Sequence, residues 1–271
     1  MEQRSVKVLP ISVVIPSRNV RDKLEKTLSN LMGQLREGDQ VVVVDDDSSD
    51  GLRDMLEATF SPPVKYVRLE DHKKWRLNTV RNAGIQASSN PIIYMLDADC
   101  VPQPECVDRM REQAGKGRYV SGIILYDVSL REQRRQAKKF KGMSTSVVAV
   151  GDYPVEEIIR RIEDDSDEVR GTLGCNVMFH REDAEKVGFY DEDFDGHYGY
   201  DDTALLLALH FSGVEHVTPR TCKSLMRAIV YHQPQRVRVY QRKWRNAGLR
   251  FNRALLRGKL QSYREGKFKD E

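Results

Sequence analysis

The stretch Pro91-Ile-Ile-Tyr-Met-Leu-Asp-Ala-Asp99 places two carboxylates directly after an apolar run. Upstream, Val41-Val-Val-Val-Asp-Asp-Asp-Ser-Ser-Asp-Gly51 has the same arrangement, and residues 11–15 form a third apolar run that is followed by a polar turn. Short apolar runs bounded by turn residues are typical of fully buried strands. The three stretches therefore predict strands whose ends carry polar side chains.

Helical and strand patterns alternate around these three strands. Apolar residues at 20, 24, 28 and 31 have helical spacing, as do those of residues 78–87. We expect further strands at residues 64–69, 119–125, 175–179 and 225–231, and further helices at 181–187 and 203–211. This alternation predicts an α/β protein with a doubly wound, mostly parallel sheet. Ligands of such sheets bind beyond the carboxyl ends of the strands, where the polar turns meet at one rim.

Composition excludes several classes of protein. The chain has 271 residues, of which 39% are hydrophobic and 31% charged, and no apolar run approaches the roughly 20 residues of a membrane-spanning helix. The N-terminus lacks the apolar stretch of a signal peptide, so we expect a cytoplasmic protein. Its four cysteines form no C-x-x-C pair, which predicts reduced thiols. The motifs of P-loop NTPases, α/β-hydrolases and typical NAD enzymes are missing.

Two groups of carboxylates suggest chemistry at the rim. Asp97 and Asp99 follow a strand at i and i+2, where both can reach one Mg²⁺ or Mn²⁺ ion, although a simple turn is the structural alternative. The second group is formed by the acids of residues 45–50. Asp50 or Ser49 can cap the next helix, which leaves Asp46 without an explanation. A carboxylate at that strand end can accept the imide N–H of a uracil.

Further candidates lie along the helices. Either Arg76 or Arg81 can neutralise a diphosphate, and a solvated basic face is the alternative for Arg81. Asp201 and Asp202 open an apolar helix, where acids are common. One carboxylate crowded by another would bind a proton more tightly and would suit a general base. His232 ends a strand, and a lone histidine is more often structural, but Mn²⁺ accepts imidazole as a ligand.

The order of these motifs resembles the GT-A fold nucleotide-sugar glycosyltransferases, especially the inverting family 2. Val14-Ile-Pro-Ser-Arg-Asn19, Val43-Val-Asp-Asp-Asp-Ser-Ser-Asp-Gly51, Arg81-Asn-Ala-Gly84 and Leu96-Asp-Ala-Asp99 carry the resemblance in the first half. Gly174-Cys-Asn-Val-Met-Phe-His-Arg181, Val187-Gly-Phe-Tyr-Asp-Glu-Asp-Phe194, Gly196-His-Tyr-Gly-Tyr-Asp-Asp202 and Val230-Tyr-His232 resemble a galactosyltransferase-like C-terminal half.

The resemblance implies a role for each matching residue. The nucleotide and its diphosphate would be bound by Pro16, Ser17, Arg18, Asp46, Arg76, Asn82, Asp97 and Ala98. Asp99 and Asp97 would hold the metal, together with His232. Asp202 would be the catalytic base, and Asp201 would hold the acceptor or donor sugar. The sequence departs from the family pattern in Asp201, which replaces a Glu, and in His197 and Tyr198, which replace a Trp.

The activity implied by the resemblance is a metal-dependent transfer, with Mn²⁺ or Mg²⁺. A hexose or N-acetylhexosamine would pass from a UDP-linked donor to a hydroxyl of a glycan, lipid-linked or protein acceptor, with inversion. A retaining GT-A transferase and a sugar nucleotidyltransferase are alternatives. Outside the enzymes, the alternative is a glycan- or nucleic-acid-binding protein. No nucleic-acid motif accompanies the basic tail, so we expect no nucleic acid as partner.

We expect a GT-A domain at residues 1–232 and a helical extension at 233–271. Within the domain, residues 1–125 would bind the nucleotide sugar, 130–170 would be a mobile insertion outside the core, and 171–232 would bind the acceptor. Residues 236–271 hold twelve Lys or Arg and three Asp or Glu, a net charge of +9. This tail would either dock on the acidic body or meet an anionic surface at the inner face of the membrane.

Overall fold

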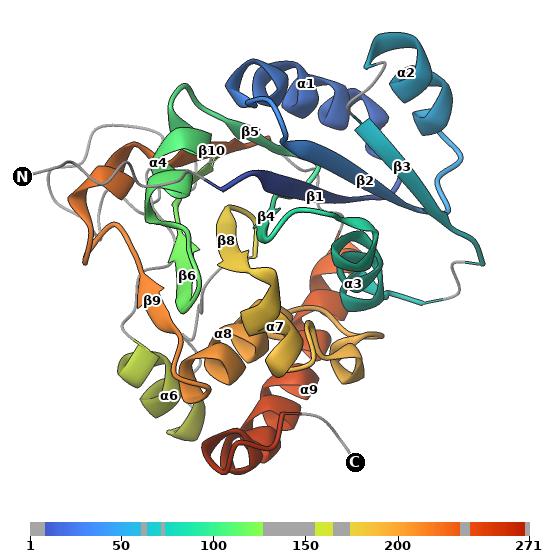
Figure 1. Cartoon of the computed structure of the whole chain (residues 1–271). Coiled ribbons are helices and arrows are strands. Elements are labelled where there is room, and N and C mark those ends of the chain that lie inside the picture. The colour runs from blue at the N-terminus through green and yellow to red at the C-terminus, as the bar shows by residue number, and fades with distance from the viewer. Residues whose placement is uncertain are drawn as a thin grey trace, which may run out of the picture.

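The computed structural model describes residues 9–60, 64–71, 74–126, 155–164, 174–233 and 239–268. These residues form two sheets with helices on both faces of the larger one (Figure 1). The strand order of the larger sheet is β3 (Val64–Leu69), β2 (Gln40–Asp46), β1 (Ile11–Ser17), β4 (Ile92–Met95), β8 (Val177–His180), β6 (Arg118–Ser121) and β9 (Glu215–Val217). The order of the smaller sheet is β5 (Cys100–Pro102), β10 (Ile229–His232) and β7 (Ile123–Tyr126).

Most neighbouring strands of the larger sheet are parallel. β1 is parallel to β2 and β4, β2 to β3, and β6 to β9, whereas β8 runs antiparallel to β4 and β6. The register pairs Ser17 with Asp45 and Asp46 with Leu69. The carboxyl ends of β1, β2 and β3 therefore lie at one rim, and the predicted α/β class is confirmed.

The central strands of the larger sheet carry apolar side chains on both faces, so helices must cover both faces to keep these side chains from water. Val41 and Val43 point into one core, and Val42 and Val44 into the other, as the alternation of strand side chains requires. The first core is closed by α1 (Arg21–Leu31), α2 (Leu52–Thr59) and α4 (Cys106–Gln113). The second is closed by α3 (Leu77–Ala87), α7 (Arg181–Lys186) and α8 (Asp201–Phe211) (Figure 1).

The expected strand at residues 119–125 is broken at Gly122 into two strands that belong to different sheets. A Cβ on Gly122 would lie 2.3 Å from Nδ2 of Asn176 and 2.6 Å from the carbonyl oxygen of Ala228. Asn176 also donates hydrogen bonds to the carbonyls of Ile123 and Ala228, at 3.1 and 3.0 Å. This close approach redirects the chain, and it depends on residues far away in sequence.

Other expectations about strands need smaller corrections. Only residues from Ile229 onward form the expected strand at 225–231, and a 3₁₀ helix, η3 (Lys223–Arg227), precedes it. β5 and β9 were not expected at all. Each has three residues, which is too short for an alternating pattern to be recognised.

Part of the segment expected to lie outside the core packs within it. Helix α6 (Val155–Glu163) buries Val155, Ile158 and Ile162 in the same core as Leu256. Residues 127–154 and 165–173 lie outside the described residues, as does most of the segment for which mobility was expected.

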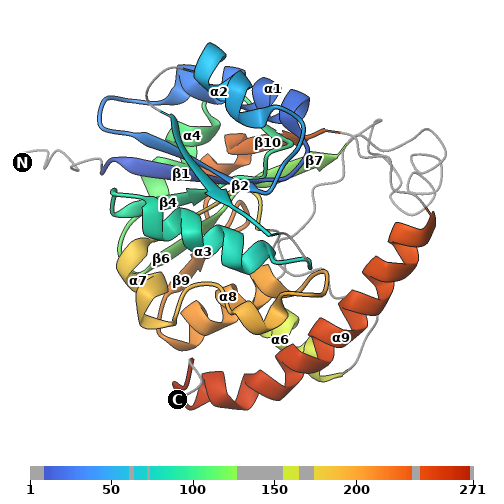
Figure 2. The ribbon, with the colours of Figure 1, turned by 90° about the vertical axis from the view of Figure 1, so that its right-hand side faces the viewer.

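The C-terminal extension is a long helix, α9 (Val239–Arg264), and it docks on the body. Figure 2 shows it running along the side of the molecule that carries α8 and α6. Leu256, Leu260 and Tyr263 are buried in the core, and Lys259 contacts Asp191 and Asp193 at 2.8 and 2.6 Å. Contact with an anionic membrane surface stays a prediction, which co-sedimentation with anionic vesicles tests. Among the described residues, no helix combines the length and apolarity needed to cross a bilayer.

A buried ion pair joins α4 to the start of the sheet and provides a test of the packing. Asp39 accepts hydrogen bonds from Arg111 at 2.8 and 2.6 Å, and the two side chains are 1% and 3% exposed. Asp39→Ala should lower the free energy of unfolding by about 3–5 kcal/mol, because it leaves the buried guanidinium of Arg111 with only the more distant carboxylate of Asp108, at 4.0 Å. The control is Glu57→Ala, since Glu57 is 65% exposed, pairs with Arg53 and should contribute below about 1 kcal/mol. Equal effects in urea unfolding would contradict the packing described for Asp39.

Candidate active site

The end of β2 forms the first part of the rim. Oδ1 of the buried Asp46 accepts a hydrogen bond from Nε of Arg76 at 2.6 Å, and Nη1 of Arg18 lies 3.8 Å from Oδ2. Arg76 also donates to the carbonyls of Leu69 and Glu70, at 3.2 and 2.7 Å. The structure thus brings together three residues that were expected to bind the nucleotide.

The end of β1 lies beside Asp46. Pro16 and Ser17 are its last two residues, and both are buried. Ser17 Oγ has no hydrogen-bond partner within the described part of the chain. A buried hydroxyl without a partner is uncommon, and its position at the end of β1 makes Ser17 a candidate for a ligand contact.

Arg81 lies at the centre of the second part of the site. Its guanidinium, which is 2% exposed, lies 2.5 Å from Asp201 Oδ2 and 2.7 Å from Asp202 Oδ1. Its Nη2 is 3.9 Å from Oδ1 of Asp97. Both alternatives considered for Arg81 are therefore wrong, because it is neither on a solvated face nor available to a diphosphate. The burial of Arg81 could have been predicted from its position on a helix whose apolar residues, such as Val80 and Ile85, face the core.

Crowding changes the acidity of these groups. Burial, together with the charges of Asp201 and Asp97, raises the pKa of Asp202 to about 8, although Arg81 opposes the change. Burial and the charge of Asp99 also raise the pKa of Asp97, again against Arg81. Asp202 thus has the raised proton affinity expected of a general base.

The third part of the site lies around Asp99. Oδ1 of this buried carboxylate is 3.6 Å from His232 Nε2, and its Oδ2 is 3.5 Å from Lys23 Nζ. Ligand atoms of Asp99, His232 and Cys100 all lie within 4.8 Å of one another. A carboxylate and an imidazole suit Mn²⁺, so the residues present fit a divalent cation. Lys23 was not anticipated, because nothing in its local sequence distinguishes it.

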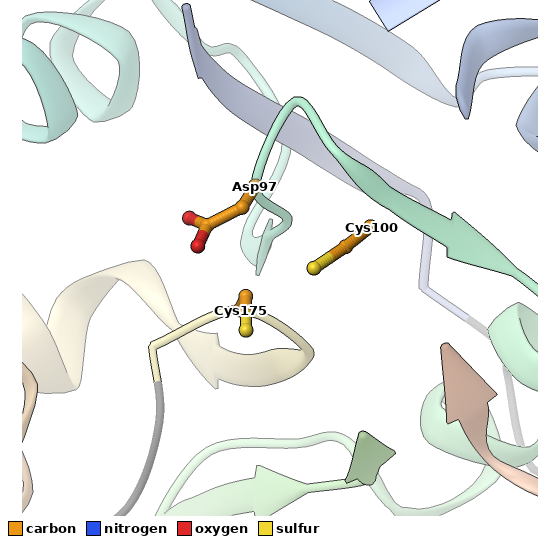
Figure 3. Close-up of side chains that lie close together, drawn as sticks. All are labelled: Asp97, Cys100 and Cys175. Carbon is orange, nitrogen blue, oxygen red and sulfur yellow. The ribbon is translucent and has the colours of Figure 1, made fainter. Parts of the chain in front are cut away.

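Two thiols lie beside the same carboxylates. Figure 3 shows Asp97 and Cys100, which share one turn, near Cys175, and their ligand atoms lie within 4.8 Å of one another. All four cysteines are free, as expected, although no His or Cys cluster near the acids was foreseen. Burial and a hydrogen bond with Cys175 raise the pKa of the Cys100 thiol. Asp97, Asp99 and His232 were expected to bind the metal together. The structure places Asp97 near Cys100 and Cys175, and it places Asp99 near His232.

Two further candidates have structural contacts. Asn82 donates to the carbonyl of Tyr190 at 2.8 Å and to Glu192 at 2.9 Å, and its Oδ1 accepts from the Tyr190 N–H at 3.0 Å. These bonds tie α3 to the segment after α7, and nucleotide binding by Asn82 stays a prediction. The buried Ala98 accepts a bond from Thr27 Oγ1 at 2.9 Å through its carbonyl oxygen.

The remaining acids of the rim are neutralised within the chain. Arg68 contacts Asp45 at 2.9 Å and Asp47 at 2.7 Å. Asp50, expected as a helix cap, instead accepts the backbone N–H of Arg21 at 2.9 Å, and Gly51 precedes α2. Asp45 and Asp47 therefore have a cation of the chain itself as their partner.

Comparisons with known proteins agree with this geometry. A sequence model of glycosyl transferase family 2 matches residues 12–188. The mannosyltransferase PcManGT from Pyrobaculum calidifontis, solved with GDP-Man and Mn²⁺, has a TM-score of 0.61 at 18% identity and covers 96% of this chain and 70% of its own. GalNAc-T7 with UDP, GalNAc and Mn²⁺ has a TM-score of 0.60 at 16% identity, covering 84% and 44%.

The fold and the site define a glycosyltransferase with the GT-A fold. The chain belongs to glycosyltransferase family 2. It is 29% identical over 234 residues to validoxylamine A glucosyltransferase from Streptomyces hygroscopicus subsp. jinggangensis, which covers 78% of this chain and 53% of that protein. The chain thus spans about half the length of this relative.

Replacing Arg81 with Met tests whether it holds the acids together. At neutral pH, Arg81→Met should lower the free energy of unfolding by about 3–5 kcal/mol, because a buried charge cluster loses its cation. Since Arg81 lowers the pKa values of Asp202 and Asp97, both would rise further in the variant. The folded state would then hold more protons than the unfolded state above the usual carboxyl pKa of 3.8, so stability should fall as pH rises.

Urea unfolding at pH 7 and pH 9 measures this dependence, because Asp202 of the original protein loses its proton near pH 8 whereas Asp202 of the variant should keep it to higher pH. The control is Arg109→Met, which removes a surface arginine that contacts Glu105 and Glu112. The same pH dependence in Arg81→Met and in the original protein would contradict the role given to Arg81.

Proposed function

We propose that the chain transfers a sugar from a nucleotide diphosphate donor, a UDP-linked hexose or N-acetylhexosamine, to an acceptor hydroxyl with inversion. One observation carries the proposal: the Asp201–Asp202 pair and the Asp99–His232 pair meet at one rim, because Asp97 approaches Arg81 and lies two residues from Asp99. The residues proposed here as general base and as metal ligands are thus near each other in a chain of glycosyltransferase family 2.

The donor would lie over the ends of β1 and β2. Asp46 would accept the imide N–H of uracil, with Arg76 orienting its carboxylate, and Ser17 Oγ would take a further contact. Arg18 and Lys23 supply positive charge at the same rim, which suits a diphosphate. UDP is also the nucleotide in the GalNAc-T7 structure, whereas PcManGT was solved with GDP-Man.

Asp99 and His232 would hold the divalent cation, with Asp97 nearby. When bound, such an ion supplies Lewis acidity that neutralises a leaving diphosphate. The chain's own contribution is to keep these ligands close together before the ion arrives. Lys23, 3.5 Å from Asp99, offsets part of their negative charge.

Asp202 would accept the proton of the acceptor hydroxyl. The acceptor oxygen forms a bond to the anomeric carbon as the bond to the donor phosphate breaks on the opposite face, and the proton moves to the Asp202 carboxylate. Asp201 would hold a sugar hydroxyl beside it. Arg81 orients both carboxylates, since it lies within 2.7 Å of each.

Metal dependence is tested with Asp99→Ala. Nucleotide release from a UDP-sugar should fall at least about a hundredfold, because Lewis-acid stabilisation is worth several kcal/mol. EDTA should have the same effect on the original protein. Asp47→Ala is the matched control, since Asp47 is another rim carboxylate but contacts Arg68 instead. Undiminished turnover of Asp99→Ala in EDTA would refute metal dependence.

The role of Asp202 is tested with Asp202→Asn. The amide is nearly isosteric but cannot accept the proton, so kcat should fall about 10²–10⁴-fold while donor affinity stays close to normal. In the original protein kcat/KM should rise with pH up to about 8, because the base acts only when deprotonated and its pKa is raised.

Two results would count against this assignment. Near-normal turnover of Asp202→Asn would remove Asp202 from the role of base. A product with the anomeric configuration of the donor, read by NMR, would replace inversion with retention.

A further inference from the structure

The two tryptophans of the chain, Trp75 and Trp244, meet at the rim although 169 positions separate them. Their ring centroids are 5.6 Å apart at an interplanar angle of 64°. Tyr198 completes a triangle, 6.0 Å from Trp75 and 6.4 Å from Trp244. We call these three side chains the aromatic wall. They come from the segment before α3, the loop before α8, and the first turns of α9.

The aromatic wall is connected along the chain to residues of both halves of the proposed active site. Trp75 directly precedes Arg76, which holds Asp46, and Tyr198 lies three residues before Asp201. The carbonyl of Trp75 accepts the N–H of Gly196 at 2.5 Å, which fixes the first segment to the loop before α8. An acceptor whose hydroxyl reaches Asp202 would therefore extend toward these rings.

Part of this aromatic surface is open to solvent. Trp244 is 40% exposed, and Phe251, also on α9, is 52% exposed and lies 3.9 Å from the ring of His197. Among the described residues only one other large apolar side chain, Met226, is exposed to a similar degree. Exposed apolar side chains gathered beside a catalytic site are typical of ligand contacts.

Helix α9 holds the loop at residues 194–200 in place. Asn252, fully buried, donates to the carbonyls of Phe194 and Gly199 at 3.2 and 2.7 Å. A Cβ on Gly248 would lie 2.6 Å from the backbone nitrogen of Tyr198, so only glycine permits this approach. The guanidinium of Arg245 lies 4.0 Å from the centroid of the Tyr198 ring. The loop that leads into Asp201 is thus shaped by a segment that sequence analysis treated as an extension.

We propose that the aromatic wall binds a sugar ring of the acceptor, an inference that rests on the proposed function. The C–H face of a pyranose is apolar and fits against an indole, while its hydroxyls would bind polar groups beside the rings such as Arg245, whose guanidinium lies 4.0 Å from the centroid of the Tyr198 ring. This mixture of exposed ring surface and nearby charge matches a carbohydrate better than an extended lipid chain, which would require a continuous apolar groove.

Intrinsic fluorescence provides a direct test, because the chain has no other tryptophan. The full chain is titrated with the methyl glycosides of glucose, N-acetylglucosamine and glucuronic acid, in the presence of UDP and Mn²⁺. At least one glycoside should give a saturable change in emission. That change should be lost in Trp244→Ala and regained in Trp244→Phe, read through the remaining Trp75.

Kinetics supply the second readout. With an active acceptor, Trp244→Ala should raise the acceptor KM about tenfold, as expected for a tryptophan that contacts a ligand, and should change kcat less. Met226→Ala is the control, since Met226 is also exposed, at 56%, but lies on η3, and it should leave KM unchanged. An unchanged acceptor KM in Trp244→Ala, together with no fluorescence response to any glycoside, would overturn the inference.

A pair of glycine variants tests the part played by α9. Gly248→Ala should weaken glycoside binding because its Cβ would displace Tyr198, whereas Gly258→Ala meets nothing within 4 Å and should only stabilise the helix. Equal glycoside binding in both variants would refute the positioning role of α9.

Thermal stabilisation by UDP with Mn²⁺ separates the two proposals. If the nucleotide and metal do not stabilise the original protein, the proposed function fails. If they do and the glycosides give no signal, only the acceptor inference fails.

Discussion

The arrangement of the active site depends on one buried guanidinium. Asp201 and Asp202 start α8, Asp97 follows β4, and all three carboxylates lie within 3.9 Å of the guanidinium of Arg81. Three carboxylates in a poorly solvated site repel unless a cation lies between them. Arg81 supplies that charge from α3, a helix packed between the sheet and α8, so the position of α3 determines whether the acids can assemble.

The other acids of the rim are neutralised in the same way, because each group of carboxylates lies beside a basic side chain of the chain itself. Arg68 forms ion pairs with Asp45 and Asp47, and Arg76 forms one with Asp46. Lys23 and His232 lie beside Asp99. Distributing the charges in this way leaves the carboxylates ordered without any ligand. A divalent cation and a diphosphate would then enter a site in which much of the electrostatic repulsion is already compensated.

Helix α9 changes how the basic C-terminal segment is understood. Its net positive charge suggested an anionic partner outside the protein, yet its buried side chains close the core and its first turns hold the loop before α8. The contacts of Arg245, Gly248 and Asn252 with that loop make the helix part of the catalytic body. The proposed acceptor surface exists only because α9 brings Trp244 to Trp75.

The sequence by itself determined the α/β class, the central strands and the rim residues that follow them, because apolar runs such as Val41–Val44 and the acids after them are local patterns. It also pointed to Asp46 with Arg76, to Asp99 with His232 and to the acid pair. Only the tertiary structure decided the break at Gly122, the structural use of Asn82, the burial of Arg81 and the meeting of the two tryptophans. Each of these depends on a contact between residues that are distant in the chain, such as Gly122 with Asn176 or Arg81 with Asp201. The sequence does not show whether a charged or aromatic side chain is surrounded by solvent or by another segment of the chain. That environment is determined by tertiary packing.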